Sequence, residues 1–211
     1  MISLNHVSKT FTMKGKILIP AVQEVNLNVA QGEFVVIAGR SGSGKTTLLN
    51  LVAGLVRPTS GQVQIDHTDI WSLTDKEQSY LRNRKMGFVF QFPSLLPSLT
   101  ILENVLLPTL LRSAAEKREA YARAELLLSE VGLSDKLVAY PRQLSAGQQQ
   151  RVVVARSLIN NPKILLADEP TSNLDEQTER EIITLLEGIH ANNGITLMLV
   201  THAEELVTCG S

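Results

Sequence analysis

Residues 39–46 of this 211-residue chain have the sequence Gly39-Arg40-Ser41-Gly42-Ser43-Gly44-Lys45-Thr46. The apolar run Phe34–Ala38 precedes them, and the helix-favouring run Thr47–Ala53 follows. Three glycines at this spacing let the backbone curl so that successive N–H groups point inward, and a helix that starts here adds the positive end of its dipole. The pattern therefore predicts a strand, a phosphate-binding loop and a helix, in that order.

The end of this loop indicates which part of a nucleoside triphosphate it holds. Lys45 is placed to reach the β- and γ-phosphates as a point charge, and Thr46 is placed to offer its hydroxyl to Mg²⁺. The alternative, a glycine-rich turn without a ligand, is rare where a strand precedes such a loop and a helix follows it. The residues expected to bind the nucleotide here are Gly39, Arg40, Ser41, Gly42, Ser43, Gly44, Lys45, Thr46 and Thr47.

Composition narrows the class of protein. An apolar content of 44% is enough for one core, so we expect a single domain with one or two lobes. Lys and Arg number 20 against 21 for Asp and Glu, and this net charge of −1 removes the electrostatic case for nucleic acid as a partner. The single Cys209 excludes an internal disulfide and is typical of a reducing compartment.

The chain contains no pattern typical of a membrane span or a signal peptide. No run of about 18 apolar residues occurs, and the N-terminal residues lack a basic segment followed by an apolar one. The most apolar stretch, Ile101–Leu111, is interrupted by Glu103, Asn104 and Pro108. We therefore expect a cytosolic protein that acts at a membrane only through a partner.

Short apolar runs predict further strands on both sides of the loop, and two residues near them are candidates for nucleotide contact. Gly87–Phe90 has the pattern of a buried strand and ends on Gln91, at the edge where α/β folds hold ligand-facing groups. Phe11 stands in a chain with only 4% aromatic residues. Its ring either stacks on a nucleobase or fills the core, and its position alone leaves both interpretations open.

A continuous apolar run, Ile164–Ala167, is followed by two adjacent carboxylates, Asp168 and Glu169. Such a run is typical of a strand buried on both faces of a parallel sheet, and two acids at its end are costly to leave unpaired. A nearby cation would explain them. Asp168 suits a Mg²⁺ ligand and Glu169 suits a base that polarises the attacking water, whereas a capping or salt-bridge role is the alternative.

Two other positions have both a structural and a functional interpretation. His202 follows the apolar run Ile195–Val200, at the strand edge where a γ-phosphate would lie, although a lone histidine is more often structural. Ser145 opens a helix and is a good N-cap residue, but a helix N-terminus also holds anions. Spacing alone does not separate the two interpretations of Ser145.

From Phe92 to Asn161 glycine becomes scarce and helical spacing replaces strand patterning. Apolar residues recur there at intervals of three and four before Gly132, which predicts an amphipathic helix; they are Ala120, Tyr121, Ala124, Leu127, Leu128 and Val131. We predict an α/β fold in which a P-loop core with a parallel sheet and an antiparallel β portion carries an inserted helical lobe. The core lobe comprises residues 1–91 and 162–211, and the helical lobe comprises residues 92–161.

Taken together, these motifs resemble the ATP-binding cassette of ABC transporters over nearly the whole chain. In chain order they are the phosphate loop Gly39–Thr46, Gln91 as the Q-loop, Leu144–Gln148 as the signature, Ile164–Glu169 as the Walker B strand with its glutamate, Ser172–Asp175 as the D-loop and His202 as the switch histidine. The resemblance implies that ATP and Mg²⁺ are the cofactors. It also implies that Phe11 stacks on adenine, that Gln91 senses Mg²⁺ and the attacking water, and that His202 senses the γ-phosphate.

The same resemblance implies partners. Two copies would close head to tail on two ATP molecules, each held by the phosphate loop of one subunit and by Ser145, Gly147 and Gln148 of the other. The apolar segment Phe92–Pro97 would meet an integral-membrane permease, with packing inside the helical lobe as the alternative. The protein would then lie on the cytoplasmic side of the inner membrane and hydrolyse ATP to drive transport.

Within the family, the motif sequences resemble the subgroup that serves lipoprotein release and macrolide export. A cell-division-type or other non-transport ABC ATPase is the main alternative, and a module that dimerises on ATP without turnover is a second. Two positions depart from the family pattern. Ala146 replaces a signature glycine, which we expect to be tolerated if its φ is negative, and His67 replaces a turn glycine at some cost in local stability.

Overall fold

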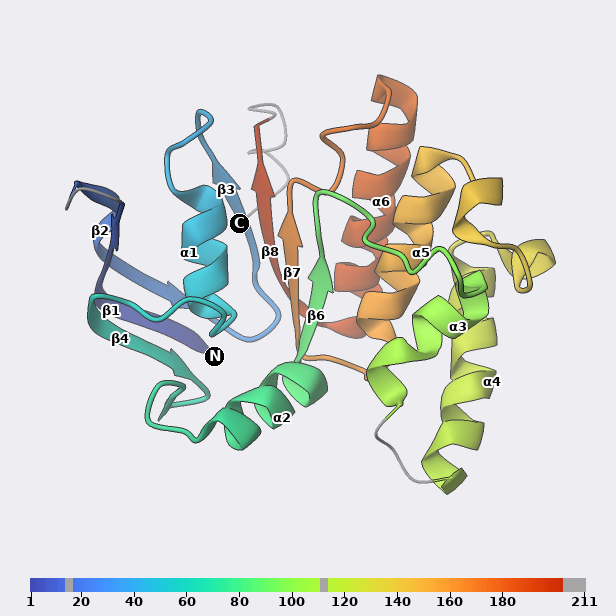
Figure 1. Ribbon diagram of the computed structural model, residues 1–211, viewed down its shortest axis with the longest axis horizontal. Coiled ribbons are helices and arrows are strands. Elements are labelled where there is room, and N and C mark those ends of the chain that lie inside the picture. Colours follow the sequence, from blue (N-terminus) through green and yellow to red (C-terminus); the bar gives the residue numbers. More distant parts are fainter. Residues whose placement is uncertain (14–16, 111–113, 203–211) are drawn as a thin grey trace.

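The computed structural model describes residues 1–13, 17–110 and 114–202, and these contain two four-stranded sheets (Figure 1). The antiparallel sheet has the order β2-β1-β4-β5, and the parallel sheet has the order β3-β8-β7-β6. The strands are β1 (Ile2–Thr12), β2 (Leu18–Val29), β3 (Phe34–Ala38), β4 (Ser60–Ile65), β5 (Thr68–Asp69), β6 (Met86–Val89), β7 (Ile164–Asp168) and β8 (Thr196–Thr201). The α-helices are α1 (Lys45–Val52), α2 (Asp75–Lys85), α3 (Ile101–Leu106), α4 (Ala114–Glu130), α5 (Ala146–Leu158) and α6 (Glu176–Asn193).

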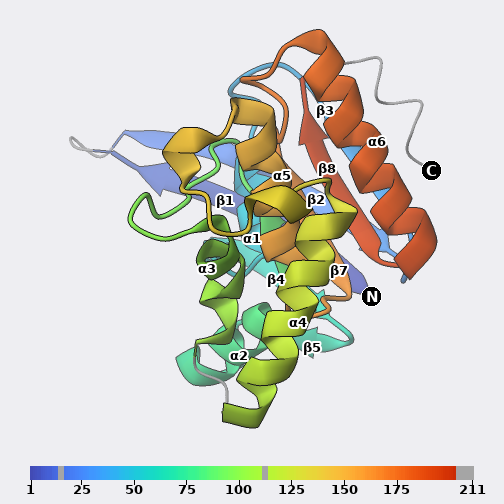
Figure 2. The same cartoon turned by 90° about the vertical axis from the view of Figure 1, so that its right-hand side faces the viewer.

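The parallel sheet is buried on both faces, as the apolar runs predict. In β7, Leu165 and Ala167 face one apolar core, which α3, α4, α5 and α6 complete, whereas Ile164 and Leu166 face a second core with α1 and the antiparallel sheet. Figures 1 and 2 show α1 on one side of this sheet and α5 with α6 on the other. The predicted α/β fold, with its antiparallel portion and its inserted helices, is confirmed.

The helix predicted before Gly132 is α4, and one of its expected inward residues was wrong. Ala120, Ala124, Leu127, Leu128 and Val131 are buried, as their spacing predicts. The side chain of Tyr121 is 48% exposed, because it lies at the edge of the apolar stripe rather than on it.

Helix ends follow local rules. Ser145 caps α5 and Asp175 caps α6, while Gly194 ends α6 with a φ of 60°.

His67 has a φ of 64° in the tight turn between β4 and β5, so the expected strain at that position is present. Ala146 lies in the first turn of α5 and its φ is not positive. This is the condition under which we expected alanine to be tolerated at this position.

Other expectations fall partly outside the described chain. Between β1 and β2 the description breaks off after Met13 and resumes at Ile17, and the Met13 N–H donates to the carbonyl of Ile17 at 3.0 Å. Cys209 lies outside the described residues. In the described ranges, no helix combines the length and the apolar character needed to cross a membrane.

Candidate nucleotide site

The phosphate loop joins β3 to α1, and the antiparallel sheet supports it from behind. Gly44 is the N-cap of α1 with a φ of 92°, and a Cβ there would collide with the carbonyl oxygen of Ala21 in β2. Gly42 also has a positive φ, 78°, but has open space around it. The N–H groups of the first turn of α1 have no partner within the helix, so Lys45, Thr46 and Thr47 present theirs at the loop.

Lys45 is buried at the centre of the loop, with only 6% of its surface exposed. Its Nζ donates to the carbonyl oxygens of Gly39 at 2.7 Å and Arg40 at 3.1 Å. The same ammonium lies 3.8 Å from Oε1 of Glu169 and 3.3 Å from Nδ1 of His202. Lys45, Glu169 and His202, which the sequence analysis selected separately, thus lie together beside the loop.

The carboxylates at the end of β7 face this loop. Oδ1 of Asp168 accepts a hydrogen bond from the Thr46 hydroxyl at 3.0 Å. Burial raises the pKa of Asp168, as does the charge of Glu169, while the Thr46 hydrogen bond and the charges of Lys45 and His202 act in the opposite direction. A cation beside Asp168 would favour its charged form, and a hydroxyl beside a carboxylate is an oxygen donor set that suits Mg²⁺.

Glu169 is held in a strained backbone conformation, with a φ of 45°. Its N–H donates to the carbonyl oxygen of Val200 in β8 at 2.9 Å, and its side chain is only 13% exposed. His202 directly follows the end of β8, and it places Nε2 2.5 Å from Oε1 of Glu169 and Nδ1 3.1 Å from the carbonyl oxygen of Gly39. The parallel register of β7 and β8 therefore brings this acid and this imidazole together.

Gln91 and Phe11 lie apart from that cluster. Gln91 follows β6 at the same edge of the sheet, since Val89 pairs with Ala167, and its side chain has no hydrogen-bond partner among the described residues. Phe11 lies on β1 with 40% of its surface exposed, and Lys9 places Nζ 5.0 Å from the ring centre. This exposure is against the core-packing interpretation of Phe11.

The signature residues lie at the start of α5, on the opposite face of the parallel sheet from α1. The hydroxyl of Ser145 accepts from the N–H of Gln148, whose side-chain Oε1 accepts from the N–H of Ser145. Gly147 is buried against Thr178 of α6. Among described residues, none of these three contacts the phosphate loop of the same chain.

Sequence reasoning missed two residues that shape the site. Ala21 supports the loop through its backbone carbonyl, which no side-chain pattern reveals. Thr178 packs on Gly147, and the only signal for it was a glycine inside a helix, which implies close approach of another element.

Fold and site together define a P-loop nucleoside triphosphatase with an inserted helical segment. The family model described as ABC transporter matches residues 22–172. The lipoprotein-releasing system ATP-binding protein LolD of Geobacter metallireducens is 46% identical over 92% of this chain and 86% of its own length. The macrolide export ATP-binding/permease protein MacB of Syntrophobacter fumaroxidans is 43% identical over 99% of this chain but only 29% of its own length. The ATP-binding cassette MJ0796, solved as a dimer in a post-hydrolysis state with ADP and Pi, superposes with a TM-score of 0.87 at 43% identity, covering 100% of this chain and 91% of that one.

The chain belongs to the ABC transporter family. Within that family it is an ATP-binding, ATP-hydrolysing subunit of a transporter. The sequence-based interpretation as an ABC ATPase is therefore confirmed.

Proposed function

We propose that ATP binds with its β- and γ-phosphates in the loop Gly39–Thr46 and its adenine on Phe11. The observation that carries this proposal is the buried Lys45, which is in contact with the loop carbonyls, Glu169 and His202 at once. This ammonium donates to the carbonyl oxygens of Gly39 and Arg40, and a phosphate would offer it stronger, charge-assisted hydrogen bonds. The exposed ring of Phe11 leaves a flat apolar surface for the base.

Mg²⁺ fits the oxygen donors at the end of β7. Thr46 and Asp168 would hold it, with Gln91 approaching from the adjacent strand end, and the metal would supply charge neutralisation at the phosphates. Glu169 polarises the attacking water, because its carboxylate is next to the loop and its backbone is fixed by Val200. His202 donates to the γ-phosphate and orients Glu169, with which it is already in contact.

Two copies of the chain close head to tail on two ATP molecules. This proposal is supported by the position of Ser145, Gly147 and Gln148 on the opposite face of the parallel sheet from α1, where they cannot reach their own phosphate loop. The N-terminus of α5, with its remaining backbone N–H groups and the positive end of its dipole, is well suited to the γ-phosphate held by a second copy. The related cassette MJ0796 was solved as a dimer.

Light scattering of the Glu169→Gln variant tests the dimer and the hydrolytic role together. If Glu169 is the base, this variant keeps ATP intact, so ATP with Mg²⁺ should convert it to a lasting dimer, whereas the parent hydrolyses the ATP and returns to monomer. ADP should not produce a dimer. A variant that binds ATP and remains monomeric at every concentration would contradict the autonomous dimer.

We further propose that a membrane permease docks in the groove beside β6. This groove has a volume of about 530 Å³, and its lining includes Leu55, Phe88, Phe90 and Arg156. The rings of Phe88 and Phe90 stack 5.7 Å apart, and Arg156 donates to the carbonyl oxygens of Pro93 and Ser94, which fixes the segment after Gln91 at the rim. The fusion of a permease to the related cassette in MacB supports such a partner.

The docking proposal is tested with Leu55→Asp, which places a charge in the groove where Leu55 is 50% exposed. Stimulation of ATP hydrolysis by a reconstituted permease should be lost, while hydrolysis by the cassette alone is retained. Val138→Asp is the control, because Val138 is 79% exposed but lies outside the groove lining. Equal stimulation of both variants would contradict docking at this site.

The subunit serves lipoprotein release or macrolide-type export, and it acts on the cytoplasmic side of the inner membrane through its permease. The similarity to LolD and MacB supports this assignment. We also propose that residues 1–91 and 162–211 form a core lobe and that residues 92–161 form a helical lobe, with the groove beside β6 between them. Purification of the chain from membranes with its permease, followed by identification of the substrate bound to that complex, tests the assignment.

A further inference from the structure

The signature helix α5 is packed against the start of α6 through an unusually close contact. Gly147 is buried, and a Cβ added to it would lie much closer to the γ-methyl carbon of Thr178 than van der Waals contact allows. The rest of the Thr178 side chain is further away, with its Cβ at 3.7 Å and its Oγ1 at 3.8 Å from that position. The γ-methyl group therefore fixes how closely the two helices approach at the signature.

The hydroxyl of the same threonine is bonded to the end of the D-loop. Oγ1 of Thr178 donates to Oδ2 of Asp175 at 2.7 Å, and its backbone N–H donates to Oδ1 at 3.0 Å. These hydrogen bonds lower the pKa of Asp175, so its carboxylate stays charged as the cap of α6. Asp175 closes the segment that leaves β7 directly after Glu169, and Ser172 in that segment donates its N–H to the Glu169 carbonyl.

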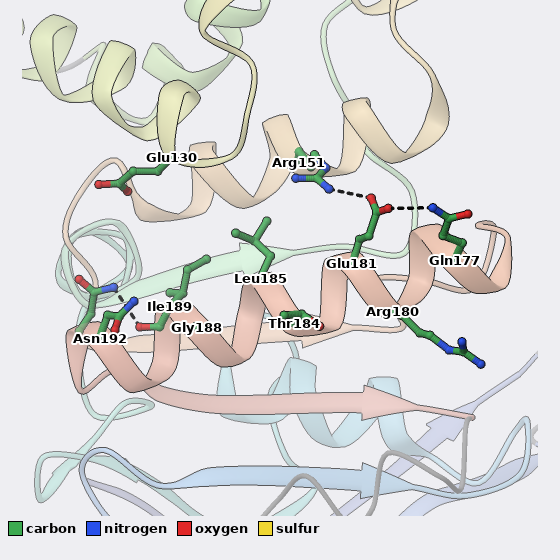
Figure 3. A pocket seen from close by; sticks show the side chains of 11 residues that line it. Glu130, Arg151, Gln177, Arg180, Glu181, Thr184, Leu185, Gly188, Ile189 and Asn192 are labelled. Atoms are coloured by element: carbon green, nitrogen blue, oxygen red, sulfur yellow. Dashed lines mark hydrogen bonds and ion pairs between the residues drawn. The ribbon is translucent and has the colours of Figure 1, made fainter.

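A second contact holds the two helices in register one turn further on. Arg151 of α5 places Nη2 2.8 Å from Oε2 of Glu181 in α6, and Gln177 donates to the other oxygen of Glu181 (Figure 3). Only 26% of the Arg151 side chain is exposed, and its Nη1 donates to the carbonyl of Val131. This ion pair is a second direct link between α5 and α6, in addition to the contact of Gly147 with Thr178.

We propose that Thr178 is a positioning residue. Its hydroxyl is bonded to Asp175 at the end of the D-loop, and its γ-methyl group determines the position of Gly147. Through these two contacts, a change at the phosphate site of one chain would shift the signature of that same chain, which binds the ATP held by the second copy. This inference rests on the proposed head-to-tail dimer, in which Gly147 contacts the ATP of the second copy. Thr178 touches no nucleotide in this arrangement and acts only through Gly147 and Asp175.

Two matched substitutions separate the methyl group from the hydroxyl. Thr178→Ser keeps the hydroxyl bond to Asp175 and removes the methyl group that touches Gly147. Thr178→Val keeps a γ-methyl group at Gly147 and removes the hydroxyl. Gly147→Ala adds the Cβ that collides with Thr178 but keeps the backbone N–H, and the double variant Gly147→Ala/Thr178→Ser makes room for that Cβ.

The first experiment measures ATP-dependent dimerisation by light scattering in the Glu169→Gln background, with the affinity of dilute monomer for a fluorescent ATP analogue as the second readout. Gly147→Ala should weaken the dimer about tenfold or more, and adding Thr178→Ser should restore most of that loss. Monomer affinity for the analogue should stay within about twofold in every variant, since the phosphate loop is on the other face of the sheet. Failure of the double variant to recover would overturn the inference.

The second experiment uses chains with Glu169 intact and needs no folded Gly147 variant. Thr178→Val should lower kcat about tenfold with little change in KM, and Thr178→Ser should retain the larger part of kcat. A merely structural role would lower the melting temperature and monomer affinity together with kcat. If Thr178→Val hydrolyses ATP as fast as the parent does, the proposed link through Asp175 is wrong. If the parent chain itself never dimerises on ATP, the proposed function is contradicted instead.

Discussion

The imidazole Nε2 of His202 lies 2.5 Å from Oε1 of Glu169, although the two residues end different strands. Lys45 lies 3.8 Å from the same carboxylate oxygen. A γ-phosphate placed in the loop would accept hydrogen bonds from Lys45 and His202, and Glu169 would then be free to accept a proton from water. Three side chains from three separate elements thus meet beside the phosphate loop.

His202→Ala removes the donor that orients Glu169 and stabilises the transferred phosphate. We expect kcat for ATP hydrolysis to fall about 100-fold or more. Affinity for ATP should change little, because the loop and Lys45 are intact. Steady-state hydrolysis and equilibrium binding measure the two effects, and a variant with the parent kcat would show that His202 is only structural.

Phe11→Ala removes the surface proposed for adenine. ATP binding should weaken by about 1–3 kcal/mol, the usual contribution of a base stacked on an aromatic side chain. The free energy of unfolding should hardly change, since the ring is 40% exposed. Phe11→Tyr keeps a stacking ring and serves as the control, with calorimetric titration as the measurement. Equal ATP affinity for the alanine and tyrosine variants would place adenine elsewhere.

Gly44→Ala and Gly42→Ala form a pair that separates collision from strain. Both positions have positive φ, which costs an alanine about 1–2 kcal/mol, but only the Cβ at Gly44 meets the carbonyl of Ala21. The extra collision should cost about 1–3 kcal/mol more. Urea unfolding should therefore show a greater loss of stability for Gly44→Ala, and equal losses would mean that β2 does not support the loop.

Glu103→Gln tests the acid dependence of stability. The Thr100 N–H and hydroxyl donate to Glu103 at 2.7 and 2.8 Å and hold its pKa below the ordinary value of 4.5. A lowered pKa in the folded state contributes stability that is fully present above pH 4.5 and is lost as the pH falls through the folded-state pKa. The parent should thus have a higher free energy of unfolding than Glu103→Gln at pH 7. This difference between the two proteins should shrink as the pH falls toward 3. Urea unfolding at both pH values measures it, and a constant gap would contradict this sign.

Much of the fold followed from local patterns. The loop Gly39–Thr46 predicts its own strand and helix, and the run Ile164–Ala167 predicts a strand buried on both faces, because each pattern reflects one element and its immediate surroundings. Tyr121 shows the limit of this reasoning. Helical spacing places it beside the apolar stripe, but only the packed neighbours decide whether a residue at the margin is covered.

The sequence named the residues of the candidate site but did not reveal the contacts between them. The sequence assigned Lys45 and His202 to phosphate and Glu169 to the attacking water, but the point where the three meet depends on the register of β7 against β8. Ser145 kept two interpretations because a capping hydroxyl and an anion site use the same helix end. Thr178 could not be found from sequence, since its importance comes from facing Gly147 on a different helix.

On the proposed arrangement, each ATP is bound between the phosphate loop of one chain and the signature of another. Lys45→Ala disables the loop, whereas Ser145→Asp keeps an N-cap residue on α5 but places a negative charge against the phosphate. Each variant alone should lack ATPase activity. A heterodimer of the two retains one complete site, composed of the loop of the Ser145→Asp chain and the signature of the Lys45→Ala chain.

The most direct measurement is therefore ATP hydrolysis by the two inactive variants before and after mixing. We predict that mixing restores activity well above that of either variant alone, and that it rises as heterodimers form. No recovery on mixing, with both chains folded, would contradict the shared site.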